Sequence, residues 1–201
     1  MYILAVIFGY LIGSIPTGYL FTRFIKNIDV REVGSGNVGA TNAARALGIR
    51  YGIIVALLDI AKGFVAVSIA FLFINPQGDM INYIPYLTGL TVILGHDHSL
   101  FLNFSGGKGV AATFGVLLRI SPPVFLIIAV IWLLLSVITR YMSAASLTSA
   151  VLMPIVLYIY LNEITAFYFF IIYGFLIIGK HHGNIKRLLR GNENRINVGK
   201  S

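Results

Sequence analysis

Residues 34–45 interleave glycines with hydroxyl and amide side chains and end on an arginine. Glycines let backbone N–H groups crowd toward an anion, and a helix that begins near Thr41 would add its dipole. Hydroxyl and amide groups are neutral donors, while an arginine offers a bidentate fork for phosphate. A flexible loop with a helix-capping Ser or Thr is the alternative interpretation. The candidate phosphate ligands in this stretch are Ser35, Asn37, Thr41, Asn42 and Arg45.

The same stretch matches the dinucleotide-binding pattern G-x-G-x-x-G through Gly34, Gly36 and Gly39, and Asp59 lies twenty residues beyond the last glycine. That fold needs a strand before the glycines and a soluble βαβ unit around them. Here the flanking residues are long apolar runs typical of membrane spans. The pattern therefore does not indicate a dinucleotide site.

A second stretch, residues 95–109, ends with Gly106, Gly107, Lys108 and Gly109. A nucleotide P-loop would need a glycine where Leu102 stands, and Ser or Thr directly after the lysine. The letters instead describe a glycine-rich turn with a counter-charge at the start of a helix, which favours anion binding. A helix-start loop with a snorkelling lysine is the alternative.

His96 and His98 flank Asp97 in the same stretch, a spacing that could suggest a metal site. A catalytic metal wants a third placed ligand, and none is fixed by spacing, so we predict hydrogen-bonded loop histidines and no metal. The acyltransferase signature of His, four residues and Asp is absent, because Phe101 and Asn103 occupy the two aspartate positions.

The third stretch, residues 180–195, is basic and amphipathic. Attraction to anionic lipid explains Lys186, Arg190 and Lys200, at about 1 kcal/mol per basic residue. His181 and Asn184 differ, because positions i and i+3 share a helical face and here lie directly after the last apolar run. We expect both side chains to point into one pocket.

The elements that must position these stretches are membrane helices. Of the 201 residues, 58% are hydrophobic and only 11% are charged, which excludes an ordinary soluble domain and a disordered chain. We predict an all-α, single-domain integral membrane protein over residues 1–201, with about seven transmembrane helices, some of them short or broken. The predicted spans cover residues 3–24, 51–74, 81–94, 109–120, 122–138, 143–161 and 164–178.

The distribution of Lys and Arg residues along the chain predicts its orientation in the membrane. With the N-terminus outside and the C-terminus in the cytoplasm, all of the 15 Lys and Arg residues except Lys62 and Arg119 fall on the inner side. The excess of basic residues then reports topology rather than a nucleic-acid surface. All three polar stretches lie on this same side, so they can converge on one cytoplasm-facing site. The absence of Cys excludes a thiol nucleophile.

Asp59 and Lys62 lie three residues apart inside the second predicted span. Each alone would cost about 2.5–3.5 kcal/mol in a membrane helix, and pairing on one face offsets that cost. We interpret them as a structural pair in preference to a catalytic one.

Three matching motifs give the chain a family resemblance: the letters SGNVGATN at residues 35–42, GH at 95–96 followed by GGKGVA at 106–111, and His181 with Asn184, Arg187 and Gly191 to Glu193. The chain resembles the bacterial acyl-phosphate:glycerol-3-phosphate acyltransferases, small multi-pass enzymes of phospholipid synthesis. It departs from them at His98 and Ser99, where the family usually has an aromatic residue and Pro.

The resemblance implies transfer of a fatty acyl group from acyl phosphate to the sn-1 hydroxyl of glycerol 3-phosphate, giving lysophosphatidic acid and phosphate. It implies a location in the bacterial inner (cytoplasmic) membrane, among membrane lipid, with the active site facing the cytoplasm and no cofactor. On this basis Ser35, Arg45 and Lys108 hold glycerol 3-phosphate. The long-chain acyl phosphate and its developing oxyanion are bound by Thr41, Asn42, Gly106, Gly107, His181 and Asn184, and Asn37 is a further substrate contact.

Several alternatives stay open. The acyl phosphate itself is the first candidate to take the hydroxyl proton, and His181 is the second. An anion transporter would also use glycine-interrupted spans, although no internal repeat is present and the outer loops are poor in polar residues. A metal-dependent phosphotransferase would need several aspartates on one helix, which the seven scattered acids do not supply. Whether a soluble enzyme that makes acyl phosphate docks on the basic inner face is left open.

Overall fold

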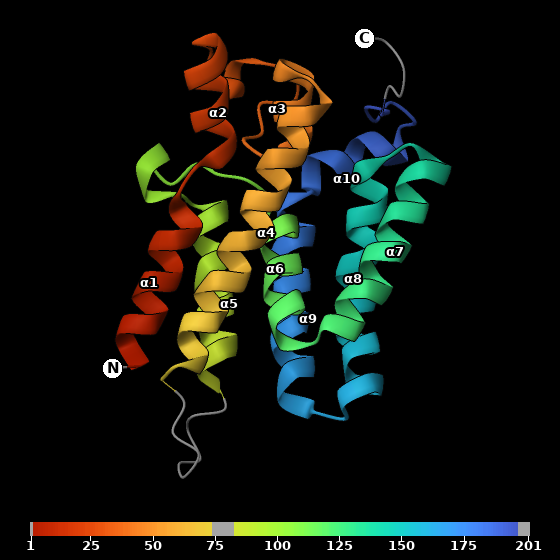
Figure 1. Cartoon of the computed structure of the whole chain (residues 1–201). Coiled ribbons are helices and arrows are strands. Elements are labelled where there is room, and N and C mark those ends of the chain that lie inside the picture. The colour runs from red at the N-terminus through yellow and green to blue at the C-terminus, as the bar shows by residue number, and fades with distance from the viewer. Residues whose placement is uncertain (1, 74–82, 197–201) are drawn as a thin grey trace. The chain divides into compact units, whose positions relative to one another are not determined.

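The computed structural model describes residues 2–73 and 83–196, and within these residues it is helical, with one isolated bridge between Ser99 and Ser105 and no strand (Figure 1). The contacts divide the chain into two compact units, Met1–Ile120 and Ser121–Ser201. We describe each unit by itself.

Unit 1 packs its long helices in contacting pairs: α1 against α5, α4 against α6, and α4 also against α1, α3 and α5 (Figure 1). In the described part of this unit, two short 3₁₀ turns shape the loops between the helices. The elements are α1 (Tyr2–Ser14), α2 (Thr17–Lys26), η1 (Val30–Glu32), α3 (Ala40–Leu47), α4 (Ile49–Phe71), α5 (Ile84–Asp97), η3 (Leu100–Leu102) and α6 (Val110–Ile120).

Glycines set the spacing between paired helices of unit 1. A Cβ built on Gly13 of α1 would lie 2.1 Å from the carbonyl oxygen of Val92, and one on Gly95 of α5 would lie 2.2 Å from that of Tyr10. Likewise, a Cβ on Gly63 of α4 would lie 2.1 Å from a carbonyl oxygen of α6, and one on Gly115 of α6 would lie 1.9 Å from a carbonyl oxygen of α4. Small residues at such contacts let membrane helices approach closely, and any side chain there would force them apart.

Unit 2 is a run of antiparallel neighbours, in which α8 contacts both α7 and α9, and α10 contacts α8 and α9. Pro154 lies inside α8, and α9 and α10 meet at a bend of 63°. The elements are α7 (Pro122–Thr139), α8 (Met142–Leu161), α9 (Ile164–Lys180) and α10 (His182–Leu189).

Each predicted span corresponds to a helix in the structure, although the first one is broken into α1 and α2. Within residues 2–73 and 83–196, four helical segments are long and apolar enough to cross a membrane, and a fifth span results if α9 and α10 count as one. As predicted, the third and fourth spans are short: α5 has 14 residues and α6 has 11. Seven crossings and the orientation of the termini stay predictions. Residues 74–82, which hold a predicted outer loop, and Lys200 lie outside the described residues.

Candidate active site

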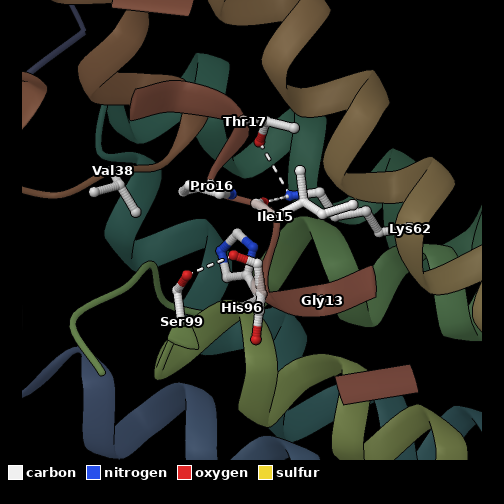
Figure 2. Close-up of a pocket in the computed structure, with 9 residues that line it drawn as sticks. Gly13, Ile15, Pro16, Thr17, Val38, Lys62, His96 and Ser99 are labelled. Atoms are coloured by element: carbon white, nitrogen blue, oxygen red, sulfur yellow. Dashed lines mark hydrogen bonds between the residues drawn. The ribbon is translucent and has the colours of Figure 1, made fainter. Parts of the chain in front are cut away.

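The break between α1 and α2 organises one end of unit 1. Helix α1 stops at Ser14, and Pro16 has no N–H with which to continue it, so the last carbonyls of α1 need donors from elsewhere. Lys62 of α4 donates to the carbonyl of Ile15, and the Ser99 hydroxyl donates to that of Ser14. Figure 2 shows Lys62 directed at Ile15 and Thr17, with His96 and Ser99 nearby.

The predicted pairing of Asp59 with Lys62 is confirmed. Lys62 Nζ lies 2.7 Å from Asp59 Oδ1, and the two residues are only 7% and 1% exposed. The Asp59 carboxylate also accepts a 2.5 Å hydrogen bond from Thr17, the first residue of α2. His96 Nδ1 lies 3.7 Å from the same oxygen, an ion-pair distance when the imidazole is protonated. The pair is thus tied to three segments: the helix break, α2 and α5.

A small cavity of about 10 Å³, room for about one water molecule, lies at the break. Its polar lining comes from the side chains just described, and Val38 of the first glycine-rich stretch closes one side (Figure 2). The lining residues are Gly13, Ser14, Ile15, Pro16, Thr17, Val38, Lys62, His96 and Ser99.

The second glycine-rich stretch lies directly on the end of α5. The Gly107 N–H donates to the His96 carbonyl at 2.8 Å, and a Cβ on Gly107 would lie 2.0 Å from His96 Nε2. A Cβ on Gly106 would lie 2.3 Å from the His96 carbonyl oxygen. Gly109 then takes a left-handed φ of +72° to start α6 at Val110. Glycine is therefore required at these positions for close approach, and it places the half-buried Lys108 just before a helix N-terminus.

Asn42 holds the first glycine-rich stretch together. Its Nδ2 donates to the carbonyls of Val30 and Val33, each at 2.8 Å, and its Oδ1 accepts from the Ser35 N–H at 3.0 Å. Asn42 is 1% exposed. The sequence suggested a direct substrate donor at this position. The observed bonds use both amide hydrogens within the chain, so Asn42 acts in this structure by shaping the loop.

The other polar residues of this stretch lie around the start of α3. The helix begins at Ala40, close to the predicted start near Thr41, and its N-cap is Gly39, which has no side chain to satisfy the first amides. Asn37 folds over Gly39, since a Cβ there would lie 3.0 Å from Asn37 Nδ2. Thr41 is half-buried and Ser35 is exposed. This end of α3 suits an anion.

Two arginines of unit 1 have different surroundings. Arg31 is bound to Asp29 through Nη2 and Oδ2 at 2.6 Å, and this hydrogen-bonded guanidinium lowers the pKa of the Asp29 carboxyl. Arg31 therefore belongs to the loop before the first stretch. Arg45 is exposed, and a Cβ on Gly34 would lie 3.4 Å from its Cδ, so its stem lies beside the loop that Ser35 occupies.

A small apolar cluster joins the two glycine-rich stretches. Val38 of the first packs with Leu102, which precedes Gly106 and Gly107 of the second, and with Val30. A Cβ on Gly18 of α2 would lie 1.9 Å from the Val38 carbonyl oxygen, so the first stretch also abuts the helix break. One apolar cluster therefore lies under both stretches of unit 1. That Ser35, Thr41, Arg45 and the segment from Gly106 to Lys108 form one site stays a prediction.

Unit 2 holds the remaining predicted residues. His181 is 3% exposed, and its Nδ1 lies 2.8 Å from the Ile177 carbonyl oxygen, which can only accept. Nδ1 therefore carries a proton, and Nε2 is the basic atom of the neutral ring. Asn184 donates to Glu193 Oε1 at 2.7 Å.

Glu193 is a neighbour of Asn184 that the sequence did not single out by itself. Its side chain is 5% exposed and accepts from Ser143 at 3.1 Å, Asn184 at 2.7 Å and Arg187 at 2.8 Å. It fixes the face of α10 on which Asn184 lies. That His181 and Asn184 join the unit 1 residues in one site stays a prediction.

Comparison with known proteins identifies the family. Residues 3–191 match the family model described as glycerol-3-phosphate acyltransferase. A glycerol-3-phosphate acyltransferase of Carboxydothermus hydrogenoformans is 38% identical over 201 residues, the full length of both chains. The Aquifex aeolicus protein of the same name is 42% identical over 94% of this chain and 96% of its own.

Solved structures agree. The glycerol 3-phosphate form of PlsY, an integral membrane glycerol 3-phosphate acyltransferase, superposes with a TM-score of 0.90 at 40% identity, over 97% of this chain and 95% of that one. The lysophosphatidic acid form of PlsY gives 0.87 at 39% identity over the same shares. With its apolar helices this is a multi-pass membrane protein. The chain belongs to the glycerol-3-phosphate acyltransferase family.

Proposed function

We propose that the protein transfers a fatty acyl group from a long-chain acyl phosphate to the sn-1 hydroxyl of glycerol 3-phosphate, forming lysophosphatidic acid and inorganic phosphate. The observation that carries the proposal is the packing of the two glycine-rich stretches on one apolar cluster in unit 1, formed by Val30, Val38 and Leu102. Each stretch leads into a helix N-terminus, and each brings a cation, Arg45 or Lys108. Two anion cradles suit a reaction in which both substrates carry phosphate.

The acceptor side is assigned to Ser35, Arg45 and Lys108, which would hold the phosphate of glycerol 3-phosphate. Arg45 supplies the bidentate fork, and Lys108 supplies a mobile charge. PlsY, a relative of known structure, is described in a glycerol 3-phosphate form, which supports this substrate class.

The donor side is assigned to the backbone N–H of Gly106 and to Thr41 and Asn37. Gly107, whose own N–H donates to the His96 carbonyl, acts on this side by shaping the turn. His181 and Asn184 would complete the donor side from unit 2. Asn42 acts instead through the loop that it holds, and this loop carries Ser35 of the acceptor side. A lysophosphatidic acid form of PlsY supports a lipid product.

The step itself joins the acceptor's hydroxyl oxygen to the acyl carbon and breaks the bond from that carbon to the phosphate oxygen. The hydroxyl proton goes to the departing phosphate, so no metal or cofactor enters the balance. An acyl phosphate is already activated, and rate comes from proximity and from donors preset around the oxyanion. Two unit charges 4 Å apart repel by about 4 kcal/mol at an effective dielectric near 20, and Arg45 and Lys108 offset that repulsion.

The positive-inside pattern supports seven crossings with an outer N-terminus and a cytoplasmic C-terminus, in the bacterial inner membrane. In that topology the site opens to the cytoplasm, where glycerol 3-phosphate is met from solution and the acyl donor from membrane lipid. The two compact units then work as one domain. A soluble enzyme that makes acyl phosphate would approach the same basic face.

The acceptor is tested with the purified protein in lipid nanodiscs, supplied with palmitoyl phosphate and either glycerol 3-phosphate, glycerol or dihydroxyacetone phosphate. We expect product only with glycerol 3-phosphate at low concentration, and two-dimensional NMR of the product should show the ester at sn-1. Equal use of glycerol, or an sn-2 ester formed directly, would contradict the assignment.

A further inference from the structure

We propose that Asp59, Lys62 and His96 are positioning residues, which hold the α1–α2 break and the end of α5 so that both glycine-rich stretches present their donors to substrate. None of the three is assigned to either phosphate. Their effect is transmitted through the backbone that they fix, and because the site they support is that of the proposed function, the inference rests on it.

The contacts of Lys62 exceed what charge neutralisation requires. An ion pair within one helix face needs only the partner three residues away, and Asp59 supplies it. Lys62 also donates to the Ile15 carbonyl and lies 3.2 Å from the Thr17 hydroxyl, on the other side of the break. The cation therefore sits at the carbonyl end of α1, where a helix dipole favours positive charge. The Ile15 carbonyl, which also accepts the Thr17 N–H at 3.0 Å, thus ties the break to α4.

Asp59 carries the connection to the second stretch. Its Oδ1 lies 3.7 Å from His96 Nδ1, and the opposite edge of that imidazole is the surface on which Gly107 lies. The His96 carbonyl also receives the Gly107 N–H at 2.8 Å. One buried residue thus supports Gly107 by its ring and by its backbone, and Lys108 follows directly in the chain.

The first stretch is supported from the same point. Thr17, which donates to Asp59 at 2.5 Å, is followed by Gly18, against which the Val38 carbonyl packs. Val38 in turn packs against Leu102, at the base of the second stretch. A rotation of α2 about the break would therefore move both phosphate stretches of unit 1 together. Fixing this break is the role that we assign to the buried network.

The test separates positioning from the plain need to avoid a lone charge in a membrane. In the double variant Asp59→Asn, Lys62→Met both charges are removed, so the insertion penalty of an unpaired ion does not arise. The protein is assayed in nanodiscs for melting temperature, for calorimetric binding of glycerol 3-phosphate, and for kcat with palmitoyl phosphate.

We expect the folded double variant to lose at least fivefold in kcat, with weaker binding of glycerol 3-phosphate. A folded double variant that keeps kcat within fivefold of the unchanged protein would overturn the proposal, since the pair would then serve neutrality alone. Thr91→Val is the matched control: it removes a partly buried hydrogen bond from Thr91 to the Val6 carbonyl between α5 and α1, away from the break. It should lower the melting temperature without lowering kcat.

Two variants of His96 test the same proposal if the double variant fails to fold. His96→Asn places an amide N–H near the position of Nδ1, whereas His96→Leu fills the space without a polar group. We expect the leucine variant to lose at least fivefold in kcat and the asparagine variant to recover part of it. Wild-type kcat in the leucine variant would overturn the proposal. If the unchanged protein binds glycerol 3-phosphate but does not turn over, the proposed function fails, and the binding series still decides the positioning role.

Discussion

Individual side chains divide into those that face substrate in the proposed site and those that shape the backbone around it. Lys108 and Arg45 belong to the first group, since each is at least partly exposed beside a glycine-rich turn. Asn42 belongs to the second, because all of its described hydrogen bonds end on the backbone of residues 30–35. The hydrogen-bond partners of a side chain, more than its residue type, show whether it faces substrate or shapes the backbone.

Replacing Lys108 by Ala should lower kcat/KM by about 10²–10³, because it removes the charge assigned to the phosphate of glycerol 3-phosphate, and losing one partner of such a charge pair costs about 2–5 kcal/mol. Folding should be retained, because the side chain is only half-buried and the adjoining glycines make the packing contacts. Initial rates of phosphate release and the melting temperature check both statements.

The exposed Lys186 of α10 is the control for Lys108. Lys186→Met also removes one positive charge from the basic face, and its rate should stay within twofold of the unchanged protein. Equal losses in the two variants would mean that only the general charge of that face matters.

His181 should act as a donor in its imidazolium form. Since Nδ1 already donates to the Ile177 carbonyl, Nε2 can donate to phosphate only when the ring is charged. We therefore expect the ratio of wild-type to His181→Gln activity to fall as the pH rises and the imidazolium loses its proton. Taking the ratio cancels the titration of the substrate phosphates.

The neighbouring, exposed His182 provides the comparison, and the ratio for His182→Gln should stay near one at every pH. A wild-type to His181→Gln ratio that rises with pH would instead identify His181 as a general base.

At the scale of the elements, glycines and one buried amide set how closely the loops approach the helices. Gly107 lies on the His96 ring, and Asn42 holds residues 30–35 in place. Both features are fixed by geometry that a single added atom or a lost bond would change.

Gly107→Ala should cost about 1–3 kcal/mol of stability through overpacking and should reduce kcat at least tenfold, because a Cβ would lie 2.0 Å from His96 Nε2. Gly179 of α9 is the matched control, since a Cβ there meets nothing within 4 Å, and Gly179→Ala should leave stability and rate unchanged or slightly raise stability. Thermal unfolding and initial rates in nanodiscs measure both. Normal turnover in Gly107→Ala would show that the ring contact is dispensable.

Asn42→Leu should leave the Val30 and Val33 carbonyls and the Ser35 N–H without their partner. Each buried group left unsatisfied costs about 1–3 kcal/mol. The loop that carries Ser35 should lose its shape, so the KM for glycerol 3-phosphate should rise more than the KM for acyl phosphate. Steady-state kinetics in both substrates test this, and a larger rise on the acyl phosphate side would assign the loop to the donor.

Across the whole molecule, hydropathy predicted the apolar helices because apolar runs and polar punctuation alternate sharply. The bounds of the last four predicted spans lie within two residues of those of α6 to α9, whereas the predicted 81–94 is displaced by three residues from α5. The break at residues 15–16 was missed, since the apolar run continues through it and only Pro16 marks it. The Asp59–Lys62 pair was predictable from its i, i+3 spacing. The contact of His96 with Asp59 was not, because it joins α5 to α4, and no local pattern reports which helices pack together.

The glycine-rich stretches were predicted as anion sites from composition, and their common base was not. Val38 and Leu102 are ordinary apolar letters in the sequence, and only the fold shows that they pack together. The same limit applies to Glu193, which lies next to Asn184 through the turn after α10.

The most direct measurement follows phosphate and lysophosphatidic acid together in one reaction of the purified protein in lipid, with glycerol 3-phosphate and either palmitoyl phosphate or palmitoyl-CoA as donor. We expect the two products to form in equal amounts from palmitoyl phosphate, without added metal, and no lysophosphatidic acid from palmitoyl-CoA. Preference for palmitoyl-CoA, or passage of glycerol 3-phosphate across sealed vesicles without turnover, would contradict a site built for two phosphates and an acyl transfer between them.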